Sequence, residues 1–214
     1  MLRQNCIKDP QKTTIDFSKI HVYNTKVQGG DSFLAGKRPV SRLNNINRYV
    51  IVDVETTGLA PSRGDRVIEI GALAIEQNQI KGEFHSLIKT GKSIPRAAQL
   101  IHGIQDKMLD GQPRPEEVFP LFHGFIQGSV LIAHNAAFDI GFLTREFGRL
   151  GLVLDNRYHC TLEISRARYP RLPNHRLETV YHHLCGKPDG KIQAHRALGD
   201  ARMVAEIWMR MMGR

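Results

Sequence analysis

Two acidic residues stand two positions apart at the end of an apolar stretch, a spacing that could support metal chemistry. Asp53 and Glu55 fall at the end of the β-branched run Tyr49 to Val54, which predicts a buried strand. Because side chains alternate along a strand, positions 53 and 55 project to one face, about 7 Å apart. Two carboxylates this close repel each other and resist desolvation, and a divalent cation removes both penalties. An isolated Asp-x-Glu is more commonly a solvated strand end, so the rest of the chain must decide.

Two further acids and one imidazole fall at the ends of other predicted elements. Asp139 lies in the first turn of a helix predicted over 136–150, directly after a short apolar strand, although alone it would be explained as a helix cap. Five positions separate His195 from Asp200, which would place them on different faces of a continuous helix. We therefore expect His195 in the loop before the last helix and Asp200 in its first turns, where the helix dipole favours a carboxylate.

These four carboxylates and the imidazole are expected to converge on one pocket. The ligand set is hard oxygen, which suits Mg²⁺ or Mn²⁺ rather than zinc. Four acids are the inventory of a phosphodiester hydrolase that uses two metal ions. In such a site one cation prepares hydroxide from water, the other stabilises the leaving 3′ oxygen, and His195 takes the proton of the water.

Three motifs in a fixed order resemble those of a known family. They are Asp53-Val-Glu-Thr-Thr-Gly-Leu59, His134-Asn-Ala-Ala-Phe-Asp139 and His195-Arg-Ala-Leu-Gly-Asp200. They are similar to the exonuclease motifs of the DEDD superfamily, and specifically of its histidine-bearing DnaQ-like (DEDDh) branch, which contains the epsilon proofreading subunit of bacterial DNA polymerase III. Residues 101–104, 161–162 and 174–177 also resemble linking segments of that family. The tyrosine branch has Tyr four positions before the last Asp, where this chain has Arg196.

The resemblance implies a ribonuclease-H-like fold and 3′→5′ hydrolysis of DNA that releases nucleoside monophosphates. It implies two Mg²⁺ or Mn²⁺ ions held by Asp53, Glu55, Asp139 and Asp200, with His195 as general base. It also implies that the 3′-terminal nucleotide is lined by Thr56, Thr57 and Leu59. We add His102, His134 and Asn135 as candidates for substrate binding. His102 is equally well explained as a charge partner at a helix C-terminus, and His134 is better explained as a structural residue than as a ligand.

The elements that must position these residues follow from hydrophobic periodicity and from Gly and Pro signals. Strands are predicted over 49–54, 67–76, 80–89, 129–133 and 152–160. Helices are predicted over 95–102, 115–127, 136–150, 161–168, 176–185 and 197–212. Pro120 should kink the second helix or delay its start, and Gly58 is free to adopt a positive φ where another molecule approaches. The order of elements predicts an α/β fold in which helices flank a five-stranded mixed sheet.

Residues 1–48 form a basic extension ahead of the domain predicted over 49–214. They carry nine Lys and Arg residues against three acids, so they supply +6 of the formal net charge of +9. Gly29-Gly30, Gly36 and Pro39 interrupt this segment, and we expect an extended arm. Its charge suits a polyanionic partner such as nucleic acid, and equally a solvated tail.

Composition argues against several other classes of protein. In this chain of 214 residues, 41% are hydrophobic, and no apolar run is long enough to span a bilayer. The first ten residues lack the apolar core of a secretory signal. Cys6, Cys160 and Cys185 are an odd, scattered set, which fits a reducing compartment and predicts a cytoplasmic protein. Their spacing with the histidines matches no zinc finger or ribbon.

Two alternative functions remain open. One is an RNA-directed 3′→5′ exonuclease with identical chemistry, since the choice depends on how a site treats the 2′-hydroxyl. The other is a non-catalytic module that holds nucleic acid or a polymerase, which the retention of all four acids and the histidine disfavours. Proofreading as a subunit of a DNA polymerase and independent action in repair are both compatible with the sequence.

Overall fold

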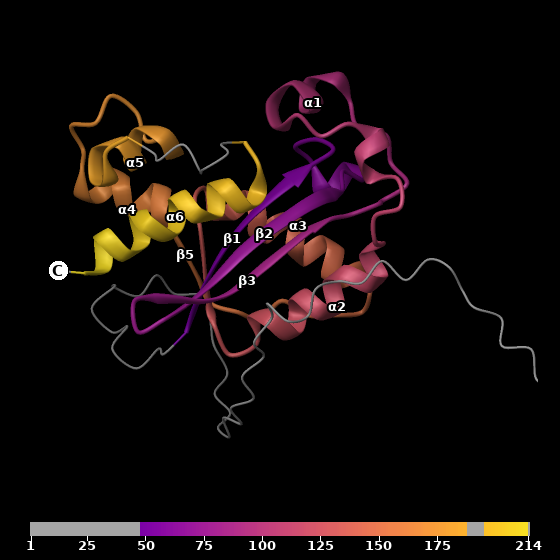
Figure 1. Cartoon of the computed structure of the whole chain (residues 1–214), viewed down its shortest axis with the longest axis horizontal. Coiled ribbons are helices and arrows are strands. Elements are labelled where there is room, and N and C mark those ends of the chain that lie inside the picture. The colour runs from indigo at the N-terminus through magenta and orange to yellow at the C-terminus, as the bar shows by residue number, and fades with distance from the viewer. Residues whose placement is uncertain (1–47, 188–194, 214) are drawn as a thin grey trace, which may run out of the picture.

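A computed structural model describes residues 48–187 and 195–213, so the predictions for the basic extension, except at Arg48, lie outside the described residues. Five strands form one sheet in the order β3-β2-β1-β4-β5, with helices on both faces (Figure 1). The strands are β1 Tyr49–Thr56, β2 Val67–Glu76, β3 Gln79–Leu87, β4 Val130–Ala133 and β5 Tyr158–Cys160. The helices are α1 Arg96–His102, α2 Pro115–Ile126, α3 Ala136–Arg149, α4 Thr161–Arg168, α5 Leu177–Cys185 and α6 Ala197–Met212. Two short 3₁₀ turns, η3 Pro61–Arg63 and η4 Asp106–Leu109, complete the described elements.

The sheet is mixed, as the sequence predicts. β1 pairs antiparallel with β2, and β2 pairs antiparallel with β3. Gln77 and Asn78 connect β2 to β3 with φ of 51° and 60°, the left-handed backbone that a tight hairpin of matching twist requires. β4 runs parallel to β1 and β5 parallel to β4. Parallel neighbours need crossover connections, and the chain supplies them with α1, α2 and α3.

Alternation along β1 divides the core between the two faces of the sheet. Val50, Val52 and Val54 are buried against α2 and α3. Ile51 points the other way, into a second cluster that contains Trp208 of α6. Residues 53 and 55 share the parity of Ile51, so they project to the α6 face. The apolar half of β1 thereby fixes the direction of the two acids that follow it.

Three local expectations need correction. The predicted strand 152–160 is regular only over Tyr158–Cys160, because Leu152 and Leu154 pack against the core from an irregular segment. α2 begins at Pro115, so Pro120 does not delay its start. Gly58 is absent from the described glycines with positive φ, and its role is steric, as described below. Within 48–187 and 195–213, none of the helices has the length and apolarity needed to cross a membrane.

Candidate active site

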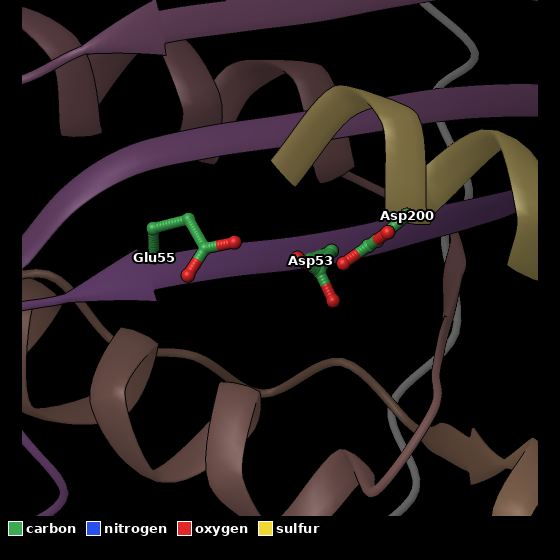
Figure 2. A group of neighbouring side chains, drawn as sticks. All are labelled: Asp53, Glu55 and Asp200. Carbon is green, nitrogen blue, oxygen red and sulfur yellow. The ribbon is translucent and has the colours of Figure 1, made fainter. Parts of the chain in front are cut away.

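Three acids from two distant parts of the chain meet at the end of β1. Asp53, Glu55 and Asp200 each place a carboxylate oxygen within 4.8 Å of the others. Figure 2 shows Asp200 reaching from α6 towards Asp53, with Glu55 further along the same strand. Such a group of carboxylate oxygens is the donor set that hard divalent cations prefer. The structure therefore brings together three of the four acids that the sequence singled out as one group.

A glycine of β2 makes this approach sterically feasible. Gly71 lies directly opposite Asp53 in the β1–β2 register. A Cβ built on Gly71 would lie 2.3 Å from the backbone nitrogen of Leu198, in the first turn of α6. Glycine inside a strand commonly marks such a close backbone approach. Because the helix lies directly on β2 at this point, Asp200 reaches the side chain of Asp53.

Asp139, the fourth predicted acid, lies beside this group and is engaged by the backbone. β4 pairs with β1 only as far as Ile51, which leaves the N–H of Val54 without a strand partner on that side. That N–H donates to Oδ1 of Asp139 over 3.2 Å. Asp139 is buried in the first turn of α3, as predicted, and its charge raises the pKa of Asp53. It is not in the group of oxygens within 4.8 Å of one another.

Burial and mutual repulsion make these carboxyl groups hard to ionise in the metal-free protein. Burial, then the neighbouring acids, raise the pKa of Asp53 well above its usual range and that of Glu55 to about 8. Burial likewise raises the pKa of Asp139 to about 8 and that of Asp200 to about 6. A bound cation would compensate both effects, since it replaces lost hydration and neutralises like charges. The site thus has the donor chemistry and the electrostatic need for a divalent cation.

His195 lies in the loop before α6, where the sequence placed it. Its backbone has a φ of 59°, in the left-handed region, and its N–H donates to Oδ1 of Asp200 over 3.2 Å. The side chain is 56% exposed, and its Nε2 lies 3.9 Å from Oε1 of Glu178 on α5. The residue is therefore tied to the acidic group through its backbone, while its imidazole has room to rotate.

The turn after β1 is held by its own polar side chains. The hydroxyl of Thr56 donates to the carbonyl of Gly58 over 2.6 Å. Thr57 is fully buried, and its hydroxyl accepts the N–H of Arg66, so this side chain is engaged inside the loop. A Cβ on Gly58 would lie 2.4 Å from the carboxylate of Asp65, which explains the glycine without a positive φ. Leu59, by contrast, is 81% exposed at the tip of the turn.

The two candidate histidines have different surroundings. His102 ends α1 and is 4% exposed; its Nδ1 accepts the N–H of Ile104, and its buried Nε2 has no hydrogen-bond partner among the described residues. Burial lowers the pKa of His102 and outweighs the opposite effect of the Thr56 backbone.

His134 is engaged on both ring nitrogens, with Thr161 at 2.9 Å and the carbonyl of His175 at 2.9 Å. This arrangement agrees with the structural role that its sequence context favours. Asn135 is exposed and starts α3 with a φ of 69°.

Sequence reasoning missed one buried charge near the site. Glu69 of β2 is opposite Glu55 in register and fully buried. Burial would raise its pKa, but hydrogen bonds from His85, Arg196 and the N–H of Ala197 outweigh this effect and lower the pKa to about 2. The available signal was a glutamate between two isoleucines in a strand that otherwise has no charged residue before its last one, Glu76. A buried charge of this kind requires partners, and the sequence did not reveal which.

The model of the exonuclease family matches residues 50–208. The chain belongs to the exonuclease family. It is 36% identical to the DNA polymerase III subunit epsilon of Pasteurella multocida, over 80% of this chain and 70% of that protein. It is also 36% identical to the DNA polymerase III subunit epsilon-like protein of Rhodobacter capsulatus, over 86% of this chain. The chain spans only 26% of the length of the Rhodobacter protein and 11% of a PolC-type relative from Clostridium perfringens.

A similar solved structure supports the fold assignment. Exonuclease X in complex with a 5′-overhanging duplex DNA superposes on the chain with a TM-score of 0.63 at 26% sequence identity. The match covers 77% of this chain and 91% of that one. The five-stranded sheet of this chain therefore has the ribonuclease-H-like fold that its motifs predict.

Proposed function

We propose that this exonuclease removes nucleotides from the 3′ end of DNA, with two Mg²⁺ or Mn²⁺ ions as cofactors. The carrying observation is the acidic group at the end of β1, where Asp53, Glu55 and Asp200 place oxygens within 4.8 Å of one another. An all-oxygen donor set of this kind favours Mg²⁺ or Mn²⁺ over softer metals. The relatives named as epsilon subunits support a DNA substrate, a polymerase partner and a role in proofreading or repair.

The residues of the chain divide the work of the proposed reaction. Asp53, Glu55 and Asp200 would hold the cations, together with the oxygen of Asp139 that does not accept from Val54. Bound cations would supply the charge that activates water and stabilises a leaving 3′ oxygen. His195 would turn away from Glu178 and accept the proton of the attacking water. Its backbone bond to Asp200 keeps it next to the acids during that turn.

The 3′-terminal nucleotide would lie over the turn that follows β1. Leu59 is exposed there and offers an apolar surface to a base. Nε2 of His102 is a buried polar atom with no hydrogen-bond partner in the described part of the chain, and a hydroxyl or phosphate of the substrate would satisfy it. We keep Asn135 as an exposed candidate, whereas Thr57 and His134 are assigned to positioning the turn and the end of β4.

The test is degradation of 3′- and 5′-labelled single-stranded DNA and RNA by the full chain, with Mg²⁺, with Mn²⁺ and with EDTA. We expect mononucleotides released from the 3′ end of DNA only when a cation is present. Asp53→Asn and Asp200→Asn should remove this activity, while Glu83→Gln, on the edge strand β3, should retain it. Full activity in EDTA, cleavage of closed circular DNA, or a preference for RNA would each contradict the proposal.

A further inference from the structure

The loop that carries His195 is anchored to the sheet by one buried carboxylate. The carboxylate of Glu69 accepts hydrogen bonds from Nε of Arg196, at 3.0 and 3.1 Å, and from its Nη2, at 2.6 Å. The same carboxylate also contacts β3, where Nε2 of His85 lies 2.8 Å from Oε1. Arg196 is 22% exposed at its side chain and Glu69 is 0% exposed, so the pair is shielded from the water that weakens surface ion pairs.

The same carboxylate also receives the start of α6. The N–H of Ala197 donates to Oε2 of Glu69 over 3.1 Å. Arg196, the residue before the helix, makes no capping bond with its own side chain, so Glu69 supplies the acceptor from another element. A carboxylate at this place also interacts favourably with the positive end of the helix dipole. One residue of β2 thus binds both the side chain of Arg196 and the backbone N–H of Ala197.

The residues that Glu69 binds, Arg196 and Ala197, lie between His195 and Asp200 in the sequence. His195 is directly before Arg196, and the N–H of Asp200 donates to the carbonyl of Arg196 over 2.9 Å. Gly71, two residues after Glu69 on the same face of β2, contacts the backbone of Leu198. We propose that Glu69 is a positioning residue of this exonuclease, which sets the first turn of α6 on β2 and thereby places Asp200 beside Asp53 and His195 beside both.

Simple packing does not explain a glutamate at this position. Glu69 faces Glu55 across the strand pair, so its charge adds to the repulsion among the acids of the site. An apolar side chain of similar volume would fill the space without that repulsion, and such replacements of buried ion pairs are commonly neutral or stabilising. What an apolar residue lacks is an acceptor for Arg196 and for the helix N-terminus. The contacts of Glu69 therefore indicate that its role is to fix the geometry of the site.

This inference rests on the proposed function, because it assumes that Asp53, Asp200 and His195 form the active site. Its test, however, does not require DNA degradation. Glu69→Gln in the full, metal-free chain should speed amide hydrogen exchange over residues 195–200 about tenfold relative to the rest of α6. Binding of Mn²⁺ alone, measured by titration calorimetry, should weaken about tenfold, since groups that orient metal ligands typically contribute 10- to 100-fold in affinity. In the DNA degradation assay, kcat of this variant should also fall about tenfold, with KM nearly unchanged.

Two further variants make the result decisive. Arg196→Lys keeps the charge but loses the two-point contact, so it should show a smaller change of the same kind and remain informative if Glu69→Gln does not fold. Glu83→Gln removes the ion pair between β3 and Arg202 of α6 and serves as the matched control, with no change expected in exchange over 195–200. If both site variants lower the melting temperature but leave exchange over 195–200 and Mn²⁺ affinity at wild-type values, Glu69 is only a stabilising residue. A wild-type chain that binds Mn²⁺ but leaves DNA intact would refute the proposed function and not the anchor.

Discussion

His195 and its neighbour Arg196 point in opposite directions, and this difference gives each a separate role. The left-handed backbone of His195 turns its imidazole towards Glu178 and solvent. Arg196 extends into the sheet and ends on Glu69. The position that carries tyrosine in the other branch of the superfamily is therefore occupied by a side chain fixed in an ion pair. Of these two side chains, the half-exposed imidazole of His195 is the one that can turn to the acidic group.

At the residue scale we therefore predict a selective loss in His195→Ala. A positioned acid–base group typically contributes about 10²- to 10⁴-fold, so kcat should fall by that factor while Mn²⁺ binding changes little. The ligands that hold the cation remain in place, because His195 contacts Asp200 through its backbone. Single-turnover degradation of a 3′-labelled strand measures the effect. His182→Ala, an exposed histidine on α5, is the control. Wild-type turnover in His195→Ala would assign the imidazole to structure alone.

At the scale of elements, the contact between β2 and α6 is what assembles the site. Gly71→Ala would place a methyl group against the backbone of Leu198, at distances no Cβ tolerates. We expect a loss of about 1–3 kcal/mol in the free energy of unfolding, typical of overpacking, as α6 shifts from the sheet. Activity should fall further than stability, because the shift carries Asp200 away from Asp53.

Urea unfolding and the degradation assay measure these two effects separately. Gly82→Ala on β3 is the matched control, since its new Cβ would meet Phe125 at an ordinary 3.4 Å. Equal behaviour of the two variants would show that the close approach at Gly71 does not position α6.

The elements and most of the site could be predicted because their signals are local. The apolar alternation before Asp53 and the stripes of α3 and α6 lie within single segments, and the periods of strand and helix place Asp139 and Asp200 at their ends. The Glu69–Arg196 pair joins residues 127 positions apart, so no local pattern indicates it. The same limit applies to Asp139, whose bond to Val54 depends on where β4 stops pairing with β1.

At the scale of the whole molecule, the fold concentrates charges that do not favour one another. Asp53, Glu55, Asp139 and Glu69 come from three elements and lie close enough to affect one another electrostatically. Of these four acids, Glu69 is the one whose partners among the described residues, Arg196 and His85, outweigh its burial and lower its pKa. Asp53, Glu55 and Asp139 would be compensated by a bound cation. Without one, they must either stay protonated or repel one another and destabilise the fold. Stability of the whole fold should therefore report on the site.

This reasoning predicts how the stability of the metal-free chain depends on pH. Glu55 and Asp139 have pKa values raised from 4.5 and 3.8 to about 8 in the folded protein. Between these values the folded state binds more protons than the unfolded state, so the free energy of unfolding falls as pH rises. Histidines 102, 134 and 159, whose pKa values are lowered from 6.5 by partial or full burial, stay neutral in both states above pH 6.5. The acids therefore dominate from about pH 6.5 to about pH 9.

In EDTA the melting temperature should fall steadily across that window. Saturating Mn²⁺ should remove the fall, because the cation binds the ionised carboxylates and gains affinity as they deprotonate. Asp139→Asn offers a matched control, since an amide retains an acceptor for the N–H of Val54 but does not titrate. Its melting temperature in EDTA should depend less on pH than that of the wild type. A metal-free melting temperature that stays constant or rises over the window would mean that these acids ionise freely, and that the fold does not need a cation to accommodate them.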